Sequence, residues 1–392
     1  MNIGIDQIGF ATSQYVLHLE DLAHARGTDP EKLSKGLLLK ELSITPVTED
    51  IVTLGAAAAM EFLTEEDKAA IDMVIVATES GIDQSKAAGV FLHGLLGINP
   101  FARTFEMKEA CYVATAALDY AKLHVRMNPA SKVLVLASDI AKYGVATPGE
   151  PTQGAGAVAM LVTANPRILA FNDDNVAQTR DVMDFWRPNY STTPFVDGIF
   201  STRQYLDSLK TTWAEYQKRT GLSLADFDAY LFHLPYPKLA LKGLNKIMDK
   251  FLPEEKKAQL QKHFDASIRY SQKVGNIYTG SLFLGLLSLL ENNEDLKAGD
   301  RIALFSYGSG AVSEIFSAVL VDGYKNQLRT NRIEELDSRT RLSVPEYEAM
   351  FFEQPQLDPE GSVTLDGYQN QAYALTEIVG HKRIYKKVED HG

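Results

Sequence analysis

The chain alternates short runs of β-branched, apolar residues with longer segments of helical periodicity. The expected strands are IDMVIVAT (71–78), KVLVLASD (132–139), AVAMLVT (157–163), DAYLFHL (228–234) and RIALFSYGSGA (301–311). The helical patterns include IVTLGAAAAMEFL, QSKAAGVFLHGLLG, ATAALDYAKLHV, KLALKGLNKIMDKFL and TGSLFLGLLSLLEN. Strands that alternate with helices of this length predict an α/β protein with buried, largely parallel sheets.

The length of 392 residues exceeds one ordinary hydrophobic core, so we expect two domains or one domain built from two similar halves. Two expected strands begin with an aspartate and end near a polar residue, Glu79 in one and His233 in the other. The polar, aromatic stretch 171–220 indicates a linking or capping region. Residues 331–392 show no clear strand after a first helix, and the final HKRIYKKVEDHG is expected to be a solvated tail.

Composition excludes several kinds of partner. The formal net charge of −12 argues against nucleic acid, because surfaces that bind nucleic acid are basic. The single cysteine, Cys111, excludes an intrachain disulfide and favours a reducing compartment. No basic, apolar leader is visible at the N-terminus, and the apolar run from Leu282 to Leu290 is too short to cross a bilayer. We therefore expect a cytoplasmic protein with no membrane partner.

Cys111 lies where a polar run, FEMKEA, gives way to an Ala-rich helical pattern. This arrangement predicts a thiol at the N-terminal end of a helix, where unpaired N–H groups and the helix dipole stabilise a thiolate. The alternative is a buried cysteine that acts only as a small apolar side chain, which is the commoner situation. A nucleophilic function therefore needs catalytic partners elsewhere in the chain.

Three further polar residues lie at or near the ends of expected elements, where α/β folds place their sites. Glu79 follows an apolar strand and is either a solvated strand end or a partly buried base. His233 lies among apolar residues and is either a satisfied core histidine or a catalytic group, and Asn276 is either a turn former or a ligand contact. Together with Cys111, these residue types suit acyl transfer through a thioester and an oxyanion.

Searches for nucleotide and metal motifs fail. GAGAVA (154–159) formally matches a dinucleotide fingerprint, but it follows a polar turn and enters a strand, which is the wrong context. The chain has no Walker A loop, no His-Glu-x-x-His and no cysteine cluster, so we expect no metal and no separate cofactor. SYGSGA (306–311) suits close approach of backbone to a ligand, to which Ser309 offers a hydroxyl.

A stripe of lysines follows the candidate histidine. Its members recur every four residues at Lys238, Lys242, Lys246 and Lys250. The stripe is either a solvated helix face or a site for the phosphates of a ligand such as coenzyme A.

Seven motifs, in this order, resemble those of the bacterial hydroxymethylglutaryl-CoA (HMG-CoA) synthases. They are ATESGID, KEACYVAT, EPTQGAGAVAMLV, DFWRP, FHLPYPK, VGNIYTGS and SYGSG, and the resemblance extends to about residue 350. It implies the fold of the thiolase superfamily, in which two similar halves form five αβαβα layers, and usually a homodimer. We place the N-terminal half at 1–168 and the C-terminal half at 169–392, with a polar extension from about residue 331.

The resemblance also implies a reaction in the mevalonate route to isoprenoids. Cys111 takes an acetyl group from acetyl-CoA, and Glu79 removes a methyl proton from the acetyl-enzyme to give an enolate. The enolate attacks C3 of acetoacetyl-CoA, whose new alkoxide is polarised and protonated by His233. Water then releases 3-hydroxy-3-methylglutaryl-CoA from Cys111. The coenzyme A thioesters are substrates in this scheme, not cofactors.

Other positions match substrate contacts or supporting groups of the family. The implied substrate contacts are Asn276 and Ser309 for the acetoacetyl group, Lys238 and Lys242 for coenzyme A, and Thr152 and Ser201 for the channel. Asp83, Asp139 and Asp184 resemble aspartates that support the geometry of the site. Val113 replaces a smaller residue of the family pattern, and its bulk is expected to slow acylation.

Two other hypotheses remain open. A ketoacyl-synthase-III-like enzyme would elongate an acyl-carrier protein, but it makes its carbanion by decarboxylation and needs no base such as Glu79. A non-catalytic module would bind coenzyme A without ever acylating Cys111. Thiolases are disfavoured because they use a second cysteine as base, and this chain has none.

Overall fold

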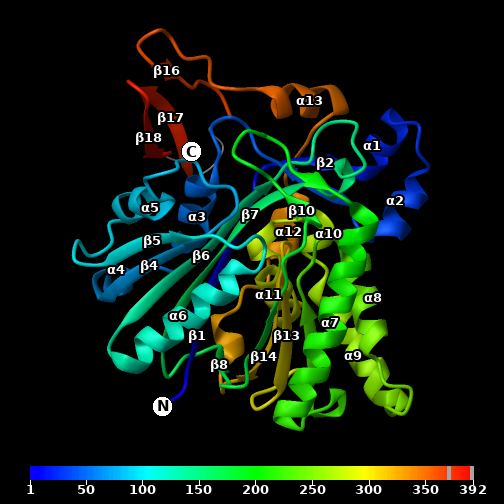
Figure 1. Cartoon of the computed structure of the whole chain (residues 1–392). Coiled ribbons are helices and arrows are strands. Elements are labelled where there is room, and N and C mark those ends of the chain that lie inside the picture. Colours follow the sequence, from blue (N-terminus) through cyan, green and yellow to red (C-terminus); the bar gives the residue numbers. More distant parts are fainter. Residues whose placement is uncertain (369–371, 389–392) are drawn as a thin grey trace.

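The computed structural model describes residues 1–368 and 372–388, and a ten-stranded sheet in the order β12-β13-β14-β8-β1-β7-β6-β4-β5 dominates it, with β9 paired to β14 (Figure 1). Its strands are β1 (Ile3–Ala11), β4 (Ile71–Ala77), β5 (Arg103–Met107), β6 (Lys132–Ala141), β7 (Gly154–Ala164), β8 (Leu169–Phe171), β9 (Val176–Thr179), β12 (Ala229–Phe232), β13 (Arg301–Gly308) and β14 (Val312–Leu320). The smaller sheets contain β2 (Tyr15–His18), β3 (Glu41–Ile44), β10 (Phe185–Trp186), β11 (Phe195–Val196), β15 (Thr340–Arg341), β16 (Val363–Thr364), β17 (Tyr373–Val379) and β18 (Lys382–Lys387).

The α-helices include the amphipathic and apolar segments that the sequence predicts. They are α1 (Leu19–Ala25), α2 (Pro30–Leu37), α3 (Ile51–Met60), α4 (Glu65–Ala70), α5 (Ala88–Leu96), α6 (Val113–Met127), α7 (Gly198–Thr220), α8 (Pro237–Ile247), α9 (Glu254–Ser267), α10 (Ser271–Val274), α11 (Ser281–Asn292), α12 (Arg332–Asp337) and α13 (Val344–Phe352). Short 3-10 turns occur at Glu150–Thr152, Leu224–Asp226, Tyr278–Gly280 and Tyr324–Gln327. Because α8 ends at Ile247, Lys250 of the predicted lysine stripe lies beyond the helix.

All of the expected strands form, but the prediction of largely parallel sheets is wrong. In the main sheet, three strand pairings are parallel and six are antiparallel. Apolar runs on both faces of a strand indicate burial, and burial here comes from helices on both sides, whatever the direction of the neighbouring strand. The direction depends on connections that apolar content does not encode.

Alternate residues of each strand pack against different helices, which divides the molecule into layers. In β4, Val74 packs with α3 and α5, whereas Ile75 packs with α6 and α11. In β13, Leu304 joins the same α6 and α11 cluster, whereas Phe305 packs with α7, α8 and α9. The helices α6 and α11 therefore lie between the two parts of the sheet, and the predicted five αβαβα layers are confirmed. Figure 1 shows α3 and α5 on one side of the molecule and α7, α8 and α9 on the other.

Strand β8 joins the two parts of the sheet, because it pairs with β1 on one side and with β14 on the other. The proposed division of the chain into 1–168 and 169–392 lies immediately before β8. That division stays a prediction. Within the described ranges, no helix combines the length and the apolar character needed to cross a membrane.

The expectation of a linking or capping region at 171–220 is wrong for its second half, which forms the 23-residue helix α7. Its buried face repeats with helical spacing but includes Gln204, Ser208 and Thr212 beside aromatic residues. Because these buried positions are polar, the apolar periodicity that predicts an amphipathic helix is not visible in the sequence of α7. The first half supplies β9 and the β10–β11 hairpin, which contains the DFWRP motif.

The expectation that the C-terminal region lacks strands and ends in a solvated tail is also wrong. The strands β17 and β18 form an antiparallel hairpin whose Tyr373 and Tyr385 pack on the cluster around α3 and α5. The Tyr385 hydroxyl donates to Asp50 at the start of α3. In KRIYKK the lysines are exposed, whereas Arg383, Ile384 and Tyr385 are half-buried, and a polar composition conceals this partial burial. The last residues of the predicted tail, 389–392, lie outside the described residues.

Candidate active site

Cys111 lies in the turn between β5 and α6, just before α6 begins, as predicted. The preceding Ala110 has φ of 41°, a left-handed conformation that a residue with a side chain rarely adopts, so the backbone here is strained. The Cys111 thiol donates to Oε1 of Glu79 at 3.0 Å. Gly308, at the end of β13, lies against the same turn, since a Cβ there would approach the Tyr112 nitrogen to 2.7 Å. The predicted nucleophile and base are therefore in contact, beside the C-terminal half of the sheet.

Glu79 follows β4 and has a strongly shifted proton affinity. Burial raises the pKa of Glu79 to about 8, and the Asp139 carboxylate acts in the same direction. The hydrogen bond from Cys111 and the charge of Arg187 oppose this rise in pKa. The Arg187 guanidinium also donates to the backbone carbonyl of Glu79. A carboxyl group with a pKa near neutrality suits general-base chemistry.

Asp139, in β6, supports the turn after β4 that contains Glu79. It is fully buried and accepts five hydrogen bonds. Its Oδ1 accepts from the Thr78 hydroxyl, the Glu79 N–H and the Ser80 hydroxyl, at 2.8, 2.9 and 2.8 Å. Its Oδ2 accepts from the Thr279 N–H and hydroxyl at 3.1 and 2.6 Å. One carboxylate therefore ties the Glu79 turn to the segment after Asn276.

The thiol is not stabilised as a thiolate, which is contrary to the expectation from its place near a helix end. Burial raises the pKa of Cys111 well above its ordinary value, and the adjacent Glu79 carboxylate raises it further. Burial and the adjacent carboxyl group together outweigh the helix dipole, which favours the anion. Cys111 is thus a protonated thiol that is hydrogen-bonded to an acceptor, and it needs that acceptor to become a nucleophile.

His233 follows β12 and is buried, with 2% of its surface exposed. Its N–H donates to the Phe305 carbonyl at 2.8 Å, and its own carbonyl accepts from the Tyr205 hydroxyl at 2.8 Å. Burial lowers the pKa of His233 to about 3, so the imidazole is neutral at physiological pH. Within the described part of the chain, Nδ1 has no hydrogen-bond partner.

Asn276 is buried and held by several bonds. Its side-chain oxygen accepts from the Tyr278 N–H and the Ser281 hydroxyl, at 2.9 and 3.0 Å. Its Nδ2 donates to the Tyr143 hydroxyl at 3.0 Å. The rings of Tyr143, Tyr278 and Phe185 pack edge to face with centroids 6.0 Å apart, so the β10–β11 hairpin covers this cluster. The charges of Cys111 and Glu79 contribute, after burial, to the raised pKa of Tyr143, which places the cluster beside them.

Asp184 organises the other side of the site, near Ser309. It is fully buried, and its carboxylate accepts from the Tyr307 hydroxyl and the Gly310 N–H, each at 2.9 Å. The Ser201 hydroxyl also donates to Asp184, at 3.3 Å. Ser309 lies between Tyr307 and Gly310 in sequence, half-buried at the end of β13.

The remaining predicted residues lie outside this hydrogen-bonded cluster. Thr152 donates to the Gly149 carbonyl at 2.9 Å, within its own turn. Lys238 is half-buried and Lys242 is exposed on α8, and neither forms an ion pair within the described residues. Asp83 is exposed and accepts only from backbone N–H groups one turn away, so it orders the loop after Glu79 and does not contact the cluster.

Sequence reasoning missed four residues that the structure joins to this cluster. They are Tyr143, Tyr278, Arg187 and Thr279. Tyr278, Arg187 and Thr279 lie inside the VGNIYTGS and DFWRP motifs. Their place in these motifs is the signal that could have identified them, because reasoning limited to Cys, His, Asn and Glu passes over them. Tyr143 lies shortly after β6, where α/β folds place functional groups.

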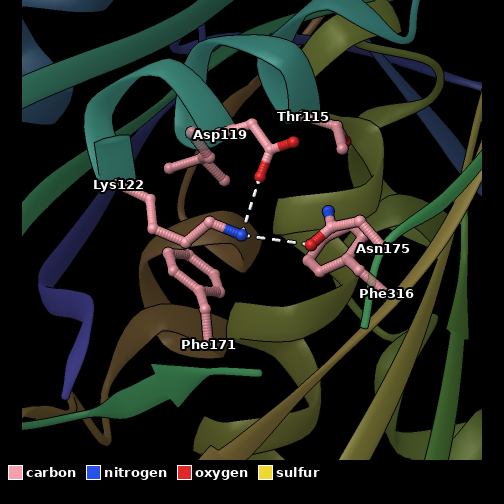
Figure 2. A pocket seen from close by; sticks show the side chains of 7 residues that line it. Thr115, Asp119, Lys122, Phe171, Asn175 and Phe316 are labelled. Atoms are coloured by element: carbon pink, nitrogen blue, oxygen red, sulfur yellow. Dashed lines mark hydrogen bonds and ion pairs between the residues drawn. The ribbon is translucent and has the colours of Figure 1, made fainter. Parts of the chain in front are cut away.

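A small cavity between α6 and β14 is separate from the candidate site (Figure 2). It is lined by Thr115, Leu118, Asp119, Lys122, Phe171, Asn175 and Phe316. Figure 2 shows the Lys122 ammonium between Asp119 and Asn175, at 2.9 and 3.1 Å. Its volume of about 10 Å³ is too small for an acyl thioester. Across the described residues, no group of His, Cys, Asp and Glu is arranged to hold a metal ion.

Comparison with known proteins identifies the family. Residues 1–167 match the model of the hydroxymethylglutaryl-coenzyme A synthase N terminal region, and residues 175–261 and 244–387 match that of the C terminal region. The hydroxymethylglutaryl-CoA synthase of Enterococcus faecalis is 52% identical over 98% of this chain and 100% of its own length. The polyketide biosynthesis 3-hydroxy-3-methylglutaryl-ACP synthase of Bacillus subtilis is 34% identical over 90% of this chain and 88% of its own length.

Solved structures agree with the sequence relatives. A crystal structure of an HMG-CoA synthase complexed with CoA superposes with a TM-score of 0.98 at 66% identity, covering 99% of this chain and 100% of that one. A structure in complex with 3-hydroxy-3-methylglutaryl coenzyme A gives a TM-score of 0.88 at 33% identity, with 99% of each chain covered. The predicted resemblance is thereby confirmed, and the chain belongs to the hydroxymethylglutaryl-CoA synthase family.

Proposed function

We propose that the protein condenses acetyl-CoA with acetoacetyl-CoA and water to give 3-hydroxy-3-methylglutaryl-CoA and coenzyme A, in the mevalonate pathway of isoprenoid synthesis. The main structural support is the 3.0 Å contact between the Cys111 thiol and the Glu79 carboxyl. A nucleophile in contact with a base of pKa about 8 suits an enzyme that must both form a thioester and deprotonate it. Family membership supports the same acyl-transferring chemistry.

The first step forms acetyl-Cys111. Glu79 in its ionised form takes the thiol proton while sulfur attacks the acetyl carbonyl of acetyl-CoA. The tetrahedral intermediate then collapses and expels the coenzyme A thiolate, which takes the proton from Glu79 and so leaves Glu79 ionised. Because the pKa of Cys111 is raised, the thiol does not ionise by itself near neutrality, and this proton transfer is part of the nucleophilic attack.

The second step makes the carbon–carbon bond. Glu79, ionised again, removes a proton from the methyl group of acetyl-Cys111, and the resulting enolate attacks C3 of acetoacetyl-CoA. The neutral imidazole of His233 donates a hydrogen bond to the C3 oxygen. His233 passes that proton to the alkoxide as it forms, and its ring recovers the proton that Glu79 removed from the methyl group, so the imidazole ends neutral and Glu79 ends ionised. Water then hydrolyses the thioester to Cys111 and releases the product.

The remaining residues bind the substrates. Asn276 and Ser309 contact the acetoacetyl group, and Thr152 and Ser201 line the channel. The phosphates of coenzyme A bind Lys238 and Lys242, whose ammonium groups have no carboxylate partner in the described ranges. No separate cofactor takes part, because coenzyme A enters as a substrate.

We also propose a homodimer that works in the cytoplasm. Strand β5 is at the edge of the main sheet, where unpaired backbone groups favour a further strand. Nearby, α6 exposes Tyr120, Leu123 and Met127, which are 43%, 55% and 80% exposed. A second copy that pairs along β5 would cover these side chains.

The test is mass spectrometry of the thioester products after the protein is mixed with acetyl-CoA and acetoacetyl-CoA. We expect hydroxymethylglutaryl-CoA with the native chain and none with Cys111→Ser. Acetylated Cys111 without condensation would show that acetoacetyl-CoA is not the second substrate. Bound coenzyme A without acylation would indicate a non-catalytic module. Acetyl and malonyl groups on an acyl-carrier protein are tested in parallel. Turnover of malonyl thioesters would favour the ketoacyl-synthase alternative, and preference for acetylated carrier protein would favour a reaction like that of the Bacillus relative.

A further inference from the structure

Helix α13 of the C-terminal extension contacts the loop that precedes β7. Tyr347 of α13 is fully buried, and its hydroxyl donates to Oε1 of Glu150 at 3.1 Å. The same hydroxyl accepts from Nε2 of Gln153 at 2.9 Å. One phenolic group, more than 190 residues away in sequence, therefore bridges two residues of the loop.

Glu150 fixes the direction of the Tyr347 hydroxyl. It is 1% exposed, and Arg26 donates to both of its oxygens at 2.9 and 2.8 Å. A carboxylate that is paired with a guanidinium in this geometry offers only hydrogen-bond acceptors. The hydroxyl proton of Tyr347 therefore points to Glu150, and its oxygen remains free to accept from Gln153.

Gln153 transmits this orientation to the backbone of the loop. Because its Nε2 donates to Tyr347, its Oε1 faces the other way and accepts from the N–H groups of Tyr143 and Gly144, at 2.8 and 3.2 Å. Gln153 is buried, so loss of the Tyr347 hydroxyl would leave its Nε2 without an acceptor, which costs free energy. The side-chain amide of Gln153 would then be free to rotate away from the Tyr143 and Gly144 N–H groups. The backbone at Tyr143 thus depends on the hydroxyl of Tyr347.

Tyr143 belongs to the candidate site. Its hydroxyl accepts from Nδ2 of Asn276, and its ring packs against Tyr278 and Phe185. We propose that Tyr347 is a positioning residue, which acts through Gln153 to hold Tyr143 and Asn276 in place for the acetoacetyl group. This inference rests on the proposed function and gives the C-terminal extension a role in the reaction.

The test is Tyr347→Phe, which removes only the hydroxyl group. The matched control is Tyr324→Phe, because Tyr324 is also buried and its hydroxyl makes one hydrogen bond, to the Leu296 carbonyl, away from the site. Loss of a buried partner is worth about fivefold or more in a rate constant. We expect kcat/KM for acetoacetyl-CoA to fall by about fivefold or more in Tyr347→Phe, with a smaller effect on acetylation of Cys111. Equal losses in both variants would overturn the proposal.

A second readout does not depend on activity. Hydrogen exchange at the amides of Tyr143 and Gly144 should speed up by about fivefold or more in Tyr347→Phe and stay unchanged in Tyr324→Phe. If these amides remain protected in Tyr347→Phe, the proposal is wrong even if activity falls.

A double-mutant cycle with Gln153→Met tests the route. If Tyr347 acts through Gln153, the double variant should lose little more kcat/KM than Gln153→Met alone, whereas multiplied losses would overturn the route. Failure of the proposed function is distinguishable, because the native chain itself would then make no hydroxymethylglutaryl-CoA.

Discussion

Replacement of the candidate base with an uncharged isostere should stabilise the protein at alkaline pH while it strongly slows condensation. The pKa of Glu79 is raised from 4.5 to about 8 on folding, chiefly by burial. The folded protein therefore holds this proton more tightly than the unfolded chain. The stability that results is fully present below about pH 4.5 and is lost as pH rises through about 8. Glu79→Gln has no proton to lose.

The size of the effect follows from the two pKa values. At about 1.36 kcal/mol per pH unit, the rise from 4.5 to about 8 corresponds to about 5 kcal/mol. Glu79 is half-buried and water screens part of its charge, so we expect about 3 kcal/mol. The unfolding free energy of the native chain should fall by this amount relative to Glu79→Gln between acidic and alkaline pH. Against a typical total of about 5–15 kcal/mol, the difference is readily measured.

The assay is urea unfolding of both proteins at intervals between about pH 5 and pH 9. The control is Glu66→Gln, because Glu66 is an exposed carboxylate in α4. The difference in unfolding free energy between native chain and variant should change with pH only for Glu79. Parallel pH profiles for the native chain and Glu79→Gln would refute the argument that burial shifts this carboxyl group. Condensation should fall by about 10²-fold or more in Glu79→Gln, as expected for loss of a general base.

Other predictions address the nucleophile, the lysines and a buried ion pair. Cys111→Ser should give no acetyl-enzyme in intact-mass measurements, and an acetylated variant would contradict the assignment. Lys242→Ala should raise KM for the thioesters by about threefold with little change in kcat. An unchanged KM would indicate that the lysines form only a solvated helix face. Arg332 is 3% exposed between Glu61 and Glu291, so Arg332→Met should lower the unfolding free energy by about 3–5 kcal/mol in chemical denaturation. Arg341→Met, which breaks an exposed pair, should cost less than about 1 kcal/mol, and equal costs would contradict the burial argument.

Much of the fold was predictable from local pattern. The strands that became β4, β6 and β13 are β-branched runs between turns, and α6 follows the polar segment that ends at Cys111. Such elements are readable because their apolar period is set by backbone geometry alone. The seven ordered motifs placed the chain in its family for a different reason, since they record side chains that one chemistry requires.

Segments whose burial depends on distant partners were not predictable. Helix α7 buries Gln204 and Thr212, and β18 packs a half-buried Tyr385 on the core in a segment rich in lysine. In each case, the apolar signal is diluted by polar residues that find partners only in the folded chain. Composition then indicates a loop or a tail where the structure has a helix or a strand.

The sequence by itself determined the family and, through that resemblance, the layered fold, and it predicted Cys111 as the nucleophile, because ordered motifs and residue types can be read without the folded chain. The tertiary structure alone decided the strand directions, the protonation state of Cys111 and the contacts of Tyr347. Strand direction depends on how the connections run, and the other two properties depend on which charges and hydroxyl groups come into contact in the buried interior. Glu79 and Cys111 are 32 residues apart, and Gln153 and Tyr347 are 194 apart, so the chain reveals their coupling only when it is folded.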